Sequence, residues 1–92
     1  MSSPAALRLT EVLDITAARP LAADLLALRG SPLTVDASGV QRLGGLCLQV
    51  LLSAQSTWSA DGLDFSVSQP SPEFAESVAQ FGVPELAQAQ QG

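Results

Sequence analysis

Few residues of this chain are of the types that carry out catalysis. The chain has no histidine, and its single cysteine, Cys47, therefore has no thiol or imidazole partner for a metal site. Its carboxylates are scattered, and the two closest to each other in the middle of the chain, Asp61 and Asp64, flank a glycine turn in which both are expected to be solvated. We therefore predict that the chain is not an enzyme and that it holds no metal or cofactor.

The most informative stretch lies between residues 33 and 52 and reads LTVDASGVQRLGGLCLQVLL. Asp36 follows a short apolar strand, where its carboxylate is expected to accept backbone N–H groups of the following turn. The pair Gly44-Gly45 precedes an apolar helix, but no lysine follows it, so it does not match a phosphate-binding loop. Cys47 shares a helical face with Leu43 and Leu51 and is predicted to be a buried, unreactive side chain.

The elements that must position these residues alternate between strands and helices. Apolar patterns predict strands over 5–10, 11–14, 33–35 and 63–67, and helices over 16–29, 44–60 and 72–81. Thr16 is the expected cap of the first helix, with Pro20 in its first turn, and Ser71 is the expected cap of the last. This order predicts an α/β fold with a partly parallel sheet.

The predicted core is drawn from every element. It comprises Leu9, Leu25, Val35, Val40, Leu43, Val50, Leu51, Phe65, Val67, Val78 and Phe81. Residues 1–86 are expected to form one domain, and the Gln- and Ala-rich residues 87–92 a flexible tail.

Composition excludes several classes of partner. The chain of 92 residues has a formal net charge of −5 and contains no lysine, so it lacks the clustered positive charge that nucleic acids and anionic membranes require. No apolar run is long enough to span a membrane, because Gly44, Gly45 and Gln49 interrupt the longest one. The first residues show no secretory signal, and the expected location is therefore cytoplasmic.

The stretch resembles the centre of a STAS domain, the module shared by sulfate transporter tails and anti-sigma-factor antagonists. The family pattern is Asp-x-Ser-x-Val, three further residues, and then Asp/Ser-Ser-Ser/Thr-Gly-Leu. Asp36, Ser38, Val40, Leu43 and Leu48 occupy matching positions. The resemblance extends from residue 7 to about residue 86. It implies a single mixed sheet of four to five strands with helices packed on one side.

The chain departs from the family at the regulatory serine, whose position is occupied by Gly45. Gly44 replaces the acidic residue before it, and no residue from 44 to 47 carries a hydroxyl group. The family's phosphorylation switch therefore cannot operate at this site. Ser38 is the nearest alternative phosphoacceptor, although a structural role in the turn is the simpler interpretation.

The resemblance also implies a surface for docking a protein partner. This predicted surface, over 38–45 and the first turns of the following helix, comprises Ser38, Gly39, Arg42, Gly44, Gly45, Leu46 and Gln49. Leu46, and Leu48 beside it, are expected to offer apolar contacts, and Arg42 is expected to be the basic residue of the surface. The glycine pair either permits close approach of a partner backbone or allows tight packing of the helix on the sheet.

Three functions are compatible with these features. The first is a bacterial regulatory module that binds a kinase-like anti-sigma factor or a related signalling protein, including those of chemotaxis clusters. The second is the cytoplasmic STAS subunit of an ABC-type lipid-transport complex, and the third is a domain that binds a small ligand or nucleotide. The sequence leaves the partner and the oligomeric state open.

Overall fold

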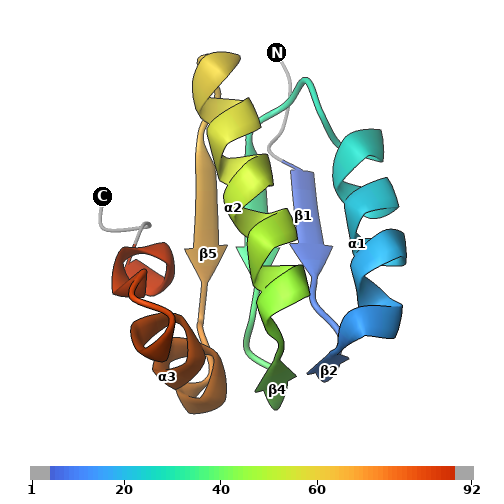
Figure 1. Ribbon diagram of the computed structural model, residues 1–92. Helices are drawn as coiled ribbons and strands as arrows, with labels where there is room; N and C mark the ends of the chain where they lie inside the picture. Colours follow the sequence, from blue (N-terminus) through green and yellow to red (C-terminus); the bar gives the residue numbers. More distant parts are fainter. Residues whose placement is uncertain (1–4, 89–92) are drawn as a thin grey trace.

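The computed structural model describes residues 5–88, which form three helices, five short strands and a 3-10 helix (Figure 1). In chain order these are β1 (Ala5–Arg8), β2 (Val12–Leu13), α1 (Ile15–Ala27), β3 (Leu33–Asp36), β4 (Arg42–Leu43), α2 (Gly45–Ala60), β5 (Phe65–Ser68), α3 (Pro72–Gln80) and η1 (Pro84–Gln88). The α/β class predicted from the alternating pattern is confirmed.

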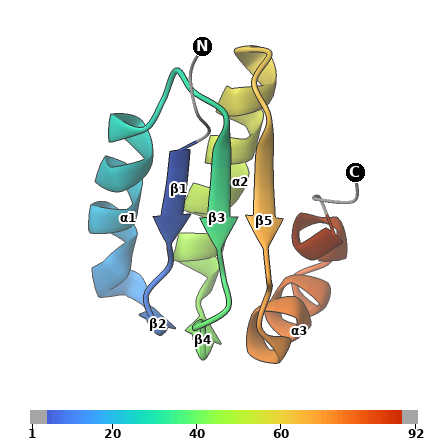
Figure 2. The same ribbon diagram turned by 180° about the vertical axis from the view of Figure 1, so that it is seen from behind.

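The strands are divided between two parallel ladders rather than one sheet. The larger has the order β1-β3-β5, with Leu7 opposite Val35 and Val35 opposite Val67. The smaller pairs β2 with β4 just beyond the carboxyl ends of β1 and β3 (Figures 1 and 2). The five strands agree with the expected number. They form two ladders, and the pairing is parallel throughout the described part of the chain.

The helices gather on one side of the larger sheet. Figure 2 shows its three strands in front, with α1 and α2 behind them and α3 beside β5. Side chains on the uncovered face are mostly polar, as expected for a face in contact with water; they belong to Ala6, Arg8, Thr34, Asp36, Ser66 and Ser68.

The cap of helix α1 lies two residues earlier than predicted. It is Asp14, whose carboxylate accepts hydrogen bonds from the Thr16 N–H at 3.0 Å and from the Thr16 hydroxyl at 2.6 Å. These hydrogen bonds lower the pKa of Asp14, the side-chain bond being the main cause. As a result, Pro20 lies inside the helix rather than in its first turn. Ser71 caps α3 as predicted, by accepting the Phe74 N–H.

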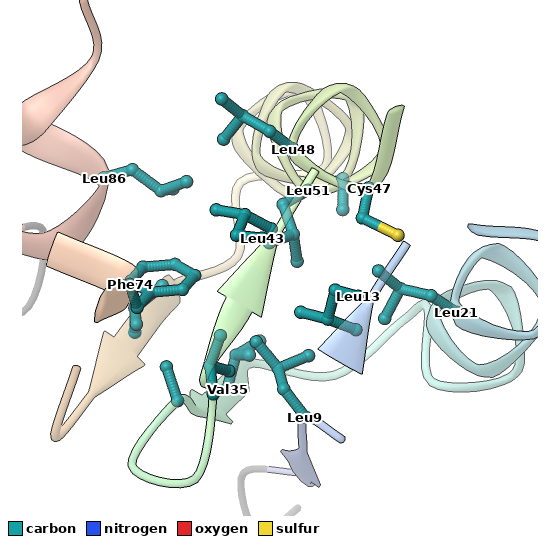
Figure 3. Packing of buried hydrophobic residues seen from close by; sticks show 14 of the residues in the cluster. Leu9, Leu13, Leu21, Val35, Leu43, Cys47, Leu48, Leu51, Phe74 and Leu86 are labelled. Carbon is teal, nitrogen blue, oxygen red and sulfur yellow. The ribbon is translucent and has the colours of Figure 1, made fainter. Parts of the chain in front are cut away.

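The core lies between the larger sheet and the helices (Figure 3). Eight of the predicted core residues are buried: Leu9, Leu25, Val35, Val40, Leu43, Leu51, Val67 and Val78. Val50 and Phe65 are only half-buried, since each lies at the margin of the core.

Phe81 was wrongly assigned to the core, because 52% of it is exposed. Helix α3 ends at Gln80, so the ring lies past the last helical turn, where no other element covers its outer side. Leu86 of η1 is fully buried and contributes to the core instead (Figure 3). Of the predicted tail, residues 89–92 lie outside the described residues, and η1 extends to Gln88.

Candidate docking site at the start of helix α2

The predicted docking surface lies at the carboxyl ends of the parallel strands. The chain leaves β3, turns through residues 37–41, forms β4 and enters α2 (Figure 1). Asp36 holds this turn, because its carboxylate accepts the Ser38 N–H at 2.9 Å. That hydrogen bond lowers the pKa of Asp36, as the structural interpretation of the residue requires.

Ser71 links the same turn to α3 through hydrogen bonds. Its buried hydroxyl donates a hydrogen bond to the Val40 carbonyl and also accepts the Phe74 N–H. In addition, the Ser71 N–H donates to the Ala37 carbonyl at 3.1 Å. The turn before α2 and the start of α3 are therefore held as one unit.

The two glycines at the start of α2 have different surroundings. Gly44 is the N-cap residue, and its N–H donates to the Leu13 carbonyl at 2.9 Å. A Cβ atom at Gly44 would lie 3.2 Å from that same oxygen, so a side chain here would crowd the backbone of β2. Gly45 is exposed, and a Cβ atom there would lie 3.6 Å from the ring of Phe81. Close packing thus explains Gly44, whereas Gly45 is accessible to a partner.

A hollow of about 440 Å³ opens between the start of α2 and the end of α3. It is lined by Gly45, Leu46, Leu48, Gln49, Leu52, Phe81 and Val83. Leu46 is 50% exposed and Phe81 is 52% exposed, so two large apolar side chains meet the solvent here. Exposed apolar side chains around a hollow are typical of a surface that another protein covers.

The structure brings together some of the predicted site residues and separates others. Gly45, Leu46 and Gln49 line the hollow, and Gly44 and Arg42 immediately precede them in the chain. Ser38 and Gly39 lie in the turn before β4 and do not line it. Leu48 was wrongly expected to be exposed: it is 3% exposed and belongs to the buried cluster at the base of the hollow.

Two residues that lie in this region were not predicted from the sequence to be there. Phe81 comes to the hollow from the end of α3, although its spacing from Phe74 and Val78 suggested a core residue. Arg8 lies beside the turn, since a Cβ at Gly39 would be 3.5 Å from its Nη2 atom. Arg42 is therefore not the only basic residue near the surface. The approach of Arg8 follows from the pairing of β1 with β3, which no local motif encodes.

Cys47 is fully buried on the inner side of α2, as predicted. Its thiol donates a hydrogen bond to the Asp14 carbonyl at 3.2 Å and lies beside Leu13 and Leu21 (Figure 3). Burial is the main cause that raises the pKa of this thiol, with the Asp14 charge adding to the effect. Cys47 is therefore protonated at neutral pH and acts as a small core residue.

Within residues 5–88, no three residues with histidine, cysteine or carboxylate side chains are grouped so that they could hold a metal ion. In the same part of the chain, no helix has the length and apolar character needed to cross a bilayer.

The parallel α/β fold, with helices on one face of the sheet and a turn that leads from β3 through β4 into α2, is that of a STAS-like domain. The family model described as "Mlab, STAS domain" matches residues 2–88, and the chain belongs to this family. STAS domains are generally non-catalytic and mediate protein–protein interactions. Comparisons with curated proteins and with solved structures found no match.

Proposed function

We propose that this chain is a cytoplasmic, bacterial protein-docking module that is not switched by phosphorylation at the start of α2. The observation that supports this proposal is the hollow at Gly45, with Leu46 and Phe81 exposed on its rim. Residues 44–47 offer no hydroxyl group that a kinase could modify, so the contact is constitutive. The partner is a kinase-like anti-sigma factor or a related signalling protein, with a chemotaxis cluster as one setting.

The same observation favours a second candidate, the STAS subunit of an ABC-type lipid-transport complex. A permanent subunit needs an apolar contact that phosphorylation does not interrupt, and the apolar rim without a hydroxyl group meets this need. In that case the hollow binds the ATPase component. The two candidates share one surface and differ in the partner bound to it.

The Gly45→Asp variant tests the docking site. Gly45 is exposed, so an aspartate fits without disturbing the core. It would place a carboxylate against the Phe81 ring, where a bound partner would bury the charge without a counterion. Because burying an unpaired charge costs several kcal/mol, affinity should fall by about 100-fold or more.

The measurement is quantitative co-purification from native cells, followed by titration with the purified partner. Ala6→Asp is the matched control, because it adds the same charge at an exposed position on the uncovered face of the sheet. We expect the partner to be lost with Gly45→Asp and retained with Ala6→Asp, with the circular dichroism spectrum unchanged in both. Recovery of a kinase-like protein or of an ABC ATPase distinguishes the two candidates. Full affinity in a folded Gly45→Asp protein would show that docking occurs elsewhere.

A further inference from the structure

A second hollow lies on the helical side of the molecule, between α1 and α2. The two helices run side by side in both ribbon views, and the groove between them has a volume of about 280 Å³. Its lining is mainly apolar and includes Ala22, Leu25, Leu26, Val50, Ala54 and Trp58. Gln49 lines both this groove and the hollow at Gly45, so α2 separates two adjacent depressions.

Helix α1 exposes an apolar stripe beside this groove. Ile15 is 74% exposed and Leu26 is 70% exposed, and no other large hydrophobic residue of the described chain is as exposed as these two. Ile15, Ala22 and Leu26 are spaced by seven and four residues, which places them on one face of the helix. A groove flanked by such a stripe matches the surface on which an amphipathic helix docks.

The charges around the groove are unusual for a chain with a net charge of −5. No carboxylate lines the groove, and α2 has no charged residue between Gly45 and Ala60. At one end Arg29 is neutralised by Asp61, with Nε and Oδ2 2.9 Å apart. Arg19 lies on the same face of α1 as Ala22 and Leu26 and, within residues 5–88, takes part in no ion pair. On this face of α1, the charge that no ion pair compensates within residues 5–88 is therefore the positive charge of Arg19.

We propose that the α1–α2 groove docks an amphipathic helix of a partner protein whose apolar stripe is flanked by acidic residues. Its apolar side chains fill the groove and cover Leu26, and a carboxylate of its flank pairs with Arg19. This surface shares only Gln49 with the proposed docking site at Gly45, and the proposal does not depend on that site.

The single tryptophan of the chain makes the proposal measurable. Trp58 lines the groove, and its indole N–H donates to the Ser31 carbonyl at 2.7 Å, so its fluorescence reports on occupancy. The probe is a synthetic helical peptide of about four turns with leucines along one stripe and glutamates beside it. A matched peptide has lysine at each glutamate position.

We expect the acidic peptide to bind saturably with a change in Trp58 emission, and about tenfold more tightly than the basic one. Leu26→Asn should weaken binding by about tenfold or more, because it removes the exposed apolar anchor. The control Leu46→Asn, at the other hollow, should leave peptide affinity unchanged. Arg19→Glu should reverse the preference, so that the basic peptide binds better.

Four results of the peptide titrations would overturn the proposal. These are no binding of the acidic peptide, equal affinity for both peptides, full affinity in Leu26→Asn, or an unchanged preference in Arg19→Glu. A second copy of the chain is the other occupant that the groove could bind, and sedimentation of the free protein tests for it. If the protein is a dimer and Leu26→Asn dissociates it, the groove binds a second copy, and the proposal of a partner helix is refuted. Because Gly45→Asp leaves the groove intact, failure here is distinguishable from failure of the docking site at Gly45.

Discussion

Alanine at Gly44 should destabilise the domain, whereas alanine at the adjacent Gly45 should not. Gly44 has φ −87° and ψ 164°, which any residue can adopt, so backbone strain is not the reason. The reason is the Leu13 carbonyl oxygen, 3.2 Å from the position of the new Cβ. This oxygen also accepts the Gly44 N–H, so it cannot move away without lengthening a hydrogen bond between β2 and the start of α2.

Two effects set the size of the loss. Alanine is a poorer N-cap than glycine by about 0.5–1 kcal/mol. Crowding against a backbone atom should add about 1 kcal/mol. The free energy of unfolding should therefore fall by about 1–2 kcal/mol, which lowers the melting temperature of a domain of this size by about 5–15 °C.

At Gly45 the expected sign is the opposite. This residue lies in the first turn of α2, where alanine has the higher helix propensity, and its Cβ would make an ordinary contact with the Phe81 ring at 3.6 Å. The free energy of unfolding should stay the same or rise by about 0.5 kcal/mol.

Urea denaturation followed by the fluorescence of buried Trp58 measures both variants under one set of conditions. Wild-type stability in Gly44→Ala would refute the argument that this glycine is required by close packing. A loss larger than about 1 kcal/mol in Gly45→Ala would show that the second glycine is structural as well.

Three further predictions concern the core and the charged turns. Leu51→Ala should lower the free energy of unfolding by about 2–5 kcal/mol, because Leu51 is fully buried; an unchanged denaturation midpoint would contradict its place in the core. Cys47 should resist alkylation at neutral pH in the native protein and react only in denaturant, and rapid labelling of the folded chain would show that α2 opens readily. The pKa values of Asp14 and Asp36 are lower in the folded chain than in the unfolded one, so their stabilisation is present above the unfolded value of about 4 and is lost as pH falls through the folded pKa. If the melting temperature stays constant as the pH is lowered below about 4, the stabilising role of these two carboxylates is refuted.

Local patterns in the sequence were sufficient for the class of fold and for much of the core. The spacing of Cys47 and Leu51 correctly predicted the inner face of α2, because side chains three and four residues apart share one side of a helix. Leu43, which the same spacing placed on that helical face, lies in β4 and is buried there. The turn at Asp36 was also predictable, since a carboxylate at a strand end bonds to the N–H groups that follow it. The cap of α3 at Ser71 was likewise predictable from the local sequence.

Features that depend on how distant segments meet could not be obtained from the sequence. The spacing of Phe81 from Phe74 fits a core position, but α3 ends before it, and the ring lies against Gly45 instead. Arg8 reaches the turn at Gly39 only because β1 pairs with β3. The difference between Gly44 and Gly45 also depends on distant segments. Gly44 faces the Leu13 carbonyl of β2, whereas Gly45 is exposed to solvent. Periodicity specifies which side of an element is apolar, whereas tertiary packing determines which of these side chains remain uncovered.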